Sequence, residues 1–381
     1  MRFLPIRRTG WLPSIGQKRI CMLRLRSDLQ NNAANLKTLE WLHNSNLIPE
    51  EYMTKFTTIL SAGLAALTLL TGTAFADGKL EKKDITIGLP VTTSTFLPLY
   101  LANEEGFFKE EGLNVKIVAF RGGTDLVRGM IAGAVDVGVT SLAGVTIGIK
   151  AKQPIKAFYG GFNMAVFDWH AVAGIKSIKD AKGKRFGVTR VGSSTDFLTR
   201  YALKTQGLDP ETDVQIVQGG GSVQRLAAME AGQIDVNIFA TPEKFMAADR
   251  GFAAILKQTD IAPDYPFHVF FATEDDINNS PNTMKAVLRA FIKGVRVAKA
   301  NKARAVEVLV KRVGMEEKYA SRGYDDFING VFEDGRLPSD AGMKTFWEIG
   351  VEAGVYKEAW SMDRFWVSTY VDSYNDWKPA K

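Results

Sequence analysis

Residues 130–137 read MIAGAVDV and residues 229–236, 99 positions later, read MEAGQIDV. In each copy a helical pattern stops at a glycine, Gly133 or Gly232, and a short apolar run follows at once. Glycine here is typical of a left-handed helix cap, because it adopts positive φ at no steric cost. Eight positions do not exclude chance similarity between common αβ turns. Two αβ lobes of similar plan are nevertheless the simplest account.

The same alternation continues outward from both copies. Strands are expected at 85–89, 114–120, 135–140, 185–189, 214–217 and 234–239, and helices at 99–105, 124–132, 195–206 and 223–231. Strands separated by helices form βαβ units, so the predicted class is α/β, with mainly parallel sheets flanked by helices. After Pro281 the pattern becomes almost wholly helical, over 283–301, 303–313 and 341–353.

The first 76 residues are excluded from the predicted fold. Lys55 precedes an uncharged stretch, 56–76, that ends in Ala74-Phe75-Ala76. This is typical of a secretory signal peptide over 53–76, with cleavage near Ala76/Asp77. The alternative is a membrane anchor, but serine and threonine dilute the apolar run below what a span needs. Residues 1–52 are interpreted as an upstream extension from a translation start placed too early, or as a genuine extra leader.

Removing this leader changes the meaning of the composition. The 381 residues are 46% hydrophobic and 24% charged, with a formal net charge of +6. Residues 1–76 carry nine of the 48 Lys and Arg and four of the 42 Asp and Glu, which leaves 39 basic and 38 acidic side chains, a net of +1. A nucleic-acid partner is therefore not expected. The one cysteine, Cys21, also lies in the leader, so the exported part has no disulfide and no cysteine metal site.

Hydroxyls and glycines follow the expected strands. Because open αβ sheets bind ligands beyond the carboxyl ends of their strands, these turns are the candidate site. The candidate ligand-binding residues are Thr93, Ser94, Thr95, Phe96, Gly123, Thr124, Thr140, Ser141, Arg190, Ser193, Ser194, Thr195, Asp196, Ser222 and Thr241.

The stretch 192–196, GSSTD, opens a helix directly after a strand. Free backbone N–H groups, hydroxyls and the positive end of the helix dipole favour an anion there. Arg190 adds a planar fork suited to a carboxylate or sulfonate. The alternative is an ordinary capped helix with Arg190 in solvent.

No motif for catalysis is present. The sequence lacks a Gly-x-Ser-x-Gly elbow, a cysteine nucleophile, a phosphate loop and a dinucleotide fingerprint in the required context. His170 and His268 lie in separate apolar runs and are interpreted as core or hinge residues. We therefore expect a protein that binds without reacting, with no catalytic residue, no metal and no cofactor.

Three segments together resemble a known family. Residues 85–89, the stretch LYLANEEGFFKEEGLNV at 99–115, and AGAVDVG at 132–138 resemble the nitrate/sulfonate/taurine class of substrate-binding proteins, and the resemblance covers about 84–330. It implies a two-lobe periplasmic binding protein fold of type II with a cleft between the lobes. By that resemblance lobe 1 is 84–170 plus 268–381, and lobe 2 is 171–267.

The same resemblance implies a periplasmic monomer that captures a small anion and closes on it by hinge rotation. Its partners would be a membrane permease dimer and a cytoplasmic ATPase. Phe96 and Phe197 beside the polar turns favour an organic sulfonate or carboxylate, with an aromatic body allowed, over nitrate. Alternatives are enzymes of this fold from thiamine-pyrimidine or menaquinone synthesis, or a sensing domain for a membrane receptor. The thiamine-pyrimidine enzymes use a cysteine-rich cluster, which the exported part lacks.

Overall fold

The computed structural model describes residues 78–164 and 166–380. The expected extension and signal peptide lie outside the described residues. The described residues belong to one compact unit. No helix in this part of the chain is long and apolar enough to cross a membrane.

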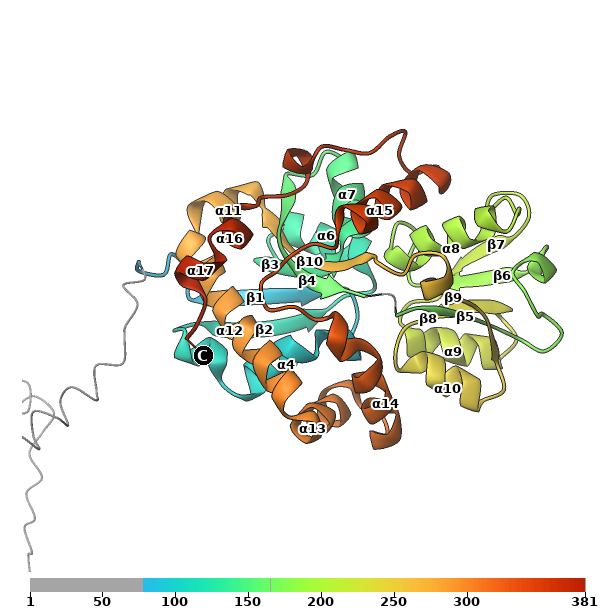
Figure 1. Cartoon of the computed structure of the whole chain (residues 1–381), viewed down its shortest axis with the longest axis horizontal. Helices are drawn as coiled ribbons and strands as arrows, with labels where there is room; N and C mark the ends of the chain where they lie inside the picture. The colour runs from blue at the N-terminus through green and yellow to red at the C-terminus, as the bar shows by residue number, and fades with distance from the viewer. Residues whose placement is uncertain (1–77, 165, 381) are drawn as a thin grey trace, which may run out of the picture. The chain divides into compact units, whose positions relative to one another are not determined.

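The first sheet has the strand order β2-β1-β3-β10-β4 (Figure 1). Its strands are β1 (Asp84–Leu89), β2 (Asn114–Ala119), β3 (Val137–Ser141), β4 (Ile155–Asn163) and β10 (Pro266–Thr273). β1 pairs in parallel with β2 and β3, whereas β10 is antiparallel to both β3 and β4. Four of the five strands therefore run the same way.

The second sheet repeats this plan in the order β7-β6-β8-β5-β9. Its strands are β5 (Asp168–Ala171), β6 (Arg185–Val188), β7 (Gln215–Gln218), β8 (Val236–Phe239) and β9 (Ala253–Lys257). β6 is parallel to β7 and β8, and β5 is antiparallel to β8 and β9. The prediction of an α/β fold with two mainly parallel sheets is confirmed.

The sequence repeat has the same structural role in both sheets. Gly133 has φ 74° and Gly232 has φ 68°, as left-handed caps require. The aspartate that follows, Asp136 or Asp235, accepts a hydrogen bond from a backbone N–H of the neighbouring strand, at 2.7 and 2.9 Å. Each carboxylate also pairs with a cation, Lys82 or Arg185. The repeat therefore fixes where β3 and β8 begin beside β1 and β6.

Helices cover both faces of the first sheet. They are α4 (Leu97–Glu104), α5 (Phe107–Glu110), α6 (Gly123–Ile131), α7 (Leu142–Lys150), α11 (Glu274–Asn279), α12 (Pro281–Ala300) and α13 (Lys302–Val313). α12 packs closely on α4, because Gly294 leaves room for the chain: a Cβ there would lie 2.1 Å from the carbonyl oxygen of Pro98. This contact holds α4 and the turn before it, η1 (Ser94–Phe96), against a long buried helix.

The last helices extend over this lobe and reach the second one. They are α14 (Glu317–Phe327), η4 (Ile328–Gly330), α15 (Asp340–Glu352), η5 (Met362–Arg364), α16 (Thr369–Asp372) and α17 (Tyr374–Trp377). α14 contacts α13, η1 and α10, while α15 contacts α8. The rings of Phe346 on α15 and Phe197 on α8 stack with centroids 5.6 Å apart.

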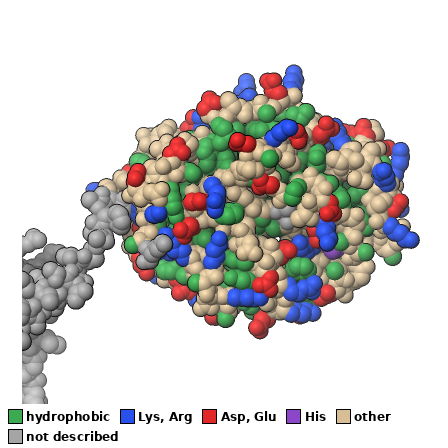
Figure 2. Space-filling model, viewed as in Figure 1, with side chains coloured by type: hydrophobic (Ala, Val, Ile, Leu, Met, Phe, Trp, Pro, Cys, Tyr) green, Lys and Arg blue, Asp and Glu red, His purple; other side chains and the backbone are tan. Residues whose placement is uncertain are grey.

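The second sheet also lies between helices (Figure 1). α8 (Ser194–Thr205) covers one side, and α9 (Ser222–Glu230) and α10 (Glu243–Asp249) cover the other. The short turns η2 (Lys179–Ala181) and η3 (Gln258–Asp260) complete this part. On the face in view, acidic and basic side chains alternate without a block of one sign (Figure 2), in keeping with the near-neutral charge after Ala76.

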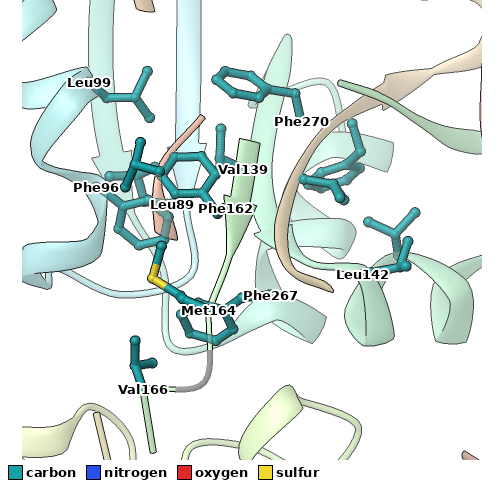
Figure 3. Packing of buried hydrophobic residues seen from close by; sticks show 14 of the residues in the cluster. Leu89, Phe96, Leu99, Val139, Leu142, Phe162, Met164, Val166, Phe267 and Phe270 are labelled. Atoms are coloured by element: carbon teal, nitrogen blue, oxygen red, sulfur yellow. The ribbon is translucent and has the colours of Figure 1, made fainter. Parts of the chain in front are cut away.

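The chain passes between the sheets twice. It leaves the first sheet after Asn163, enters the second at Asp168, and returns between Lys257 and Pro266. Met164, Val166 and Phe167 of the first crossing are buried, and Met164 lies close to Phe267 (Figure 3). The lobe boundaries expected from the sequence, at 170/171 and 267/268, stay a prediction.

Candidate functional site

Two adjoining pockets lie at the carboxyl ends of the strands. The inner pocket is formed by the turns after β1, β3, β6 and β8, the start of α9, and the two crossings at Phe167 and Phe267. The outer pocket is formed by residues after β1, β2, β6 and β7, with a volume of about 630 Å³. Val91, Thr189 and Ser222 line both. The inner pocket leaves only about 50 Å³ for a water-sized molecule, which fits the head of a small ligand rather than its whole body.

Most of the sequence-predicted residues meet at these pockets. Those lining the inner pocket are Thr93, Thr95, Gly123, Thr140, Ser141, Ser193, Ser194, Thr195 and Ser222. Arg190 lines the outer pocket, which Ser222 also reaches. Ser94, Phe96, Thr124, Asp196 and Thr241 line neither pocket. Ligand contact by the predicted residues stays a prediction.

The inner pocket collects buried polar atoms that have no hydrogen-bond partner within the described chain. They are Thr93 Oγ1, Thr95 Oγ1, Arg225 Nε, Arg225 Nη1 and His268 Nδ1. Buried polar groups are almost always paired in native proteins, and an unpaired one is costly. Several such atoms around one pocket indicate a place for a polar ligand group.

Arg225 is the charged residue of this lining. It lies on α9, is 1% exposed, and donates one hydrogen bond from Nη2 to Ser222 Oγ at 3.1 Å. The guanidinium carbon also lies 5.8 Å from the ring centre of Phe239. Burial lowers its pKa to about 10, so it is still a cation at neutral pH.

Glu243, at the start of α10, lines the outer pocket and is 3% exposed. Burial raises the pKa of its carboxyl to about 7, against a smaller lowering by the charge of Arg225. Its Oε2 has no hydrogen-bond partner in the described part of the chain. The charges of Arg225 and Glu243 shift each other's pKa, but the two side chains form no ion pair among the described residues. Neither charge is therefore fully neutralised by the other.

His268 on β10 is fully buried beside the pocket. Burial lowers the pKa of its imidazole to about 3, so the ring is neutral at physiological pH. Its ring packs edge-on against Phe96 at 4.8 Å between centroids. A neutral imidazole presents one donor and one acceptor, and here acts as a polar wall rather than a charge.

The start of α8 is a capped helix with its own acid. Ser193 is the N-cap and accepts from the Asp196 N–H, at 3.5 Å. Thr195 Oγ1 accepts from the Thr189 N–H at 2.9 Å, and Asp196 Oδ2 accepts from the Gly192 N–H at 2.8 Å. Asp196 is buried and paired with Arg200, and desolvation raises its pKa. A buried carboxylate of the protein therefore already lies at the start of this helix.

Arg190 is held across the outer pocket rather than pointing freely into it. Its guanidinium pairs with Asp125 on α6, and Thr124 Oγ1 donates to the Val191 carbonyl at 3.1 Å. Gly122, with φ 113°, brings its backbone close to Arg190, and a side chain there would clash. These residues join the two lobes at the edge of the pocket.

A second set of contacts joins the lobes on the side of α14. Ser94 Oγ donates to the Thr241 carbonyl at 2.7 Å, and Thr241 Oγ1 donates to Asp326. Lys244 binds Asp326 at 3.0 Å and lies 3.6 Å from Asp168. Ser94 and Thr241 thus have contacts between the lobes, outside both pocket linings. We call these five residues the latch.

Phe96 and Phe197, the two aromatic residues expected beside the ligand, are part of the core and line neither pocket. Phe96 is fully buried and packs against Phe162 at 6.4 Å between centroids (Figure 3). The aromatic residues that do reach the inner pocket are Phe167 and Phe267, at the two crossings. Sequence patterns alone placed Phe167 and Phe267 in no motif, because apolar residues in a crossing look like ordinary core.

Sequence reasoning also missed Arg225 and Glu243. A charged residue in a helical pattern is usually on a solvated face, so neither was among the predicted ligand-binding residues. The position of Arg225 could have identified it as a candidate. It follows Ser222 by three residues and lies on the first turn of a helix that begins after a glycine turn. Among the described residues, no group of three or more His, Cys, Asp or Glu side chains is placed to hold a metal ion.

Comparison with known sequences identifies a family. The profile of a family described as NMT1/THI5 like matches residues 93–305. A Brucella abortus protein described as a binding protein is 27% identical over 218 residues, which is 55% of this chain and 66%, just under two thirds, of that protein. The nitrate/nitrite binding protein NrtA of a Nostoc species is 26% identical over 183 residues, 46% of this chain and 40% of NrtA.

Solved structures share the fold. A Bordetella bronchiseptica protein superposes with a TM-score of 0.69 at 23% identity, covering 78% of this chain and 99% of its own. The alkanesulfonate-binding protein SsuA of Xanthomonas axonopodis pv. citri, bound to MOPS, gives 0.61 at 16% identity, with 73% and 95% covered. The periplasmic nitrate-binding protein NrtA of Synechocystis gives 0.58 at 14% identity, with 78% and 86% covered. The predicted periplasmic binding protein fold is confirmed.

Proposed function

The chain belongs to the NMT1/THI5-like family, and on this premise we propose that it is the substrate-binding protein of an ABC-type importer. It captures a small organic anion, a sulfonate or carboxylate, between its lobes and delivers it to a membrane permease dimer driven by a cytoplasmic ATPase. It works in the periplasm as a monomer, after removal of the signal peptide, and releases its ligand unchanged.

One observation carries this proposal. The inner pocket joins unpaired buried hydroxyls from the first lobe to an unpaired buried guanidinium from the second. A ligand that satisfies both sets binds best when the lobes are together, which is what a hinged binding protein needs.

The names of relatives and neighbours support the ligand class. One structural neighbour is an alkanesulfonate-binding protein, and a relative binds nitrate and nitrite. The outer pocket of about 630 Å³ next to a small polar head site favours an organic anion over a bare inorganic one. Its apolar walls include Phe120, Val91 and Val313.

The test is titration calorimetry of the purified protein with ethanesulfonate, MOPS, benzoate and nitrate. We expect saturable binding of an organic anion, stronger than that of nitrate, and a smaller radius of gyration in solution scattering at saturation. Chemical turnover of any of these compounds would instead favour an enzyme of the same fold. Binding of none of them, together with no anion recovered by native mass spectrometry, would contradict the proposal.

A further inference from the structure

Arg225 is unusual among the arginines near the pockets, because its charge is buried and has no acidic partner in contact. Arg190 is paired with Asp125, and Arg121 is exposed at the outer pocket. Arg225 makes one hydrogen bond, to the neutral hydroxyl of Ser222. Its Nε and Nη1 carry three further N–H donors without an acceptor in the described chain. A buried cation without an acceptor for its N–H groups lowers the stability of the fold, unless an anion or other acceptor binds to it.

We propose that Arg225 holds the acidic group of the ligand, at the floor of the inner pocket. This rests on the proposed function, and assigns the charged contact within it. The ligand group is an oxyanion with at least two acceptor oxygens, one for the guanidinium and one for the hydroxyls of Thr93 and Thr95 across the pocket.

The geometry favours Arg225 over the start of α8 for this charge. Asp196 already places a buried carboxylate on the Gly192 N–H. A second anion beside it would meet like-charge repulsion in a water-poor site. Arg225 faces the same pocket from α9, where the unpaired donors are. The N–H groups and the hydroxyl of Ser194 are then left to help orient the ligand rather than to neutralise it.

Glu243 partly offsets the charge of Arg225. Its carboxylate charge raises the pKa of the guanidinium, but Glu243 Oε2, Arg225 Nε and Arg225 Nη1 have no hydrogen-bond partner among the described residues. A bound oxyanion neutralises the Arg225 guanidinium in place of Glu243, and it does so in direct contact. The ligand therefore replaces a weak internal partner with a direct one, and the site discriminates acids from their neutral analogues.

The test compares Arg225→Met with wild type, using ethanesulfonate and ethanesulfonamide as probes in calorimetry, with MOPS and benzoate as further acids. Wild type binds the sulfonate far more tightly than the sulfonamide. Arg225→Met weakens sulfonate binding by about 100-fold or more, since hydrogen bonds to charged groups contribute about 1.5–3 kcal/mol each. Its affinity for the sulfonamide stays within a few-fold of wild type, so the preference for the acid is lost.

A matched control is Arg250→Gln. Arg250 lies at the end of α10 in the same lobe, and its partner is Glu230. This variant keeps the wild-type preference for the sulfonate. Melting temperatures without ligand separate binding from folding: Arg225→Met melts at or above the wild-type temperature, because it removes an unpaired buried charge.

Two results overturn the assignment. Sulfonate affinity and acid preference unchanged in Arg225→Met would show that the anion lies elsewhere in the pocket. A lower melting temperature with the same acid preference would show that Arg225 only supports the fold. Failure of the proposed function is distinct, because wild type itself would then bind none of the acids. If Arg225→Met leaves Glu243 uncompensated and folds poorly, Arg225→Met with Glu243→Gln removes both charges and must give the same loss of acid preference.

Discussion

The Ser94 hydroxyl donates a hydrogen bond to the Thr241 carbonyl oxygen at 2.7 Å, and thereby links the turn after β1 to the turn after β8. Thr241 in turn donates to Asp326, which also binds Lys244. Two turns that face the ligand site are thus tied to each other and to α14. The latch therefore stabilises the arrangement of the two sheets that the structure shows.

Weakening the latch should favour the open form. Asp326→Asn removes the charge that binds Lys244, a contribution of about 1.5–3 kcal/mol for a hydrogen bond to a charged group. Solution scattering without ligand should then give a larger radius of gyration, and hydrogen exchange around Thr241 should be faster. Asp325→Asn is the control, because Asp325 is 61% exposed and pairs with Lys302 on the surface. Equal scattering and exchange for both variants would refute the latch.

The two hydroxyls at the start of α8 should separate binding from stability. Thr195→Val removes the acceptor of the Thr189 N–H, so it should lower the unfolding free energy by about 1 kcal/mol. Ser194→Ala removes a hydroxyl that lines the inner pocket, so it should weaken sulfonate binding about 2- to 10-fold with little change in melting temperature. Calorimetry and thermal melts of both variants decide the question. A destabilised Ser194→Ala with wild-type affinity would mean that the helix start is structural only.

Glu243 should make stability fall as pH rises. Its folded pKa of about 7 is above the ordinary 4.5, so the unfolded chain releases this proton first. The contribution is complete below pH 4.5 and is lost as pH rises through 7, to the order of 3 kcal/mol. Urea unfolding at pH 5 and pH 8 should show this loss in wild type, and a smaller one in Glu243→Gln. The exposed Glu230→Gln should behave as wild type; parallel curves for all three proteins would contradict the buried acid.

His268 should act in the opposite direction. Its folded pKa of about 3 is below the ordinary 6.5, so the unfolded chain takes up a proton first as pH falls. Stability from this group is present above pH 6.5 and is lost as pH falls toward 3, on the order of 5 kcal/mol over the full window. His268→Asn should therefore lose less stability than wild type between pH 7 and pH 4. Identical losses would show that the imidazole protonates readily in the folded protein.

The sequence was informative where local rules decide the structure. Gly133 and Gly232 predicted two helix ends and two strand starts, because a left-handed cap is a local requirement. β5 and β10 were not predicted as strands, because their partners lie in other parts of the chain and no helix separates them in the expected rhythm. The serines and threonines of the inner pocket were predicted, because they directly follow expected strands and strand ends meet at one edge of a sheet. Arg225 was not, because only tertiary packing distinguishes a buried helix arginine from a solvated one.

The position of β10 also bears on synthesis. The second sheet uses one continuous stretch, from Asp168 to Lys257, and its strands are all present once that stretch has emerged from the ribosome. The first sheet lacks its fourth strand in spatial order until Pro266–Thr273 has followed. Until then β3 and β4 have unpaired edges, which are sites for wrong pairing. A chain that ends before residue 266 therefore exposes two strand edges that β10 covers in the first sheet, and we expect it to aggregate more readily than the full chain.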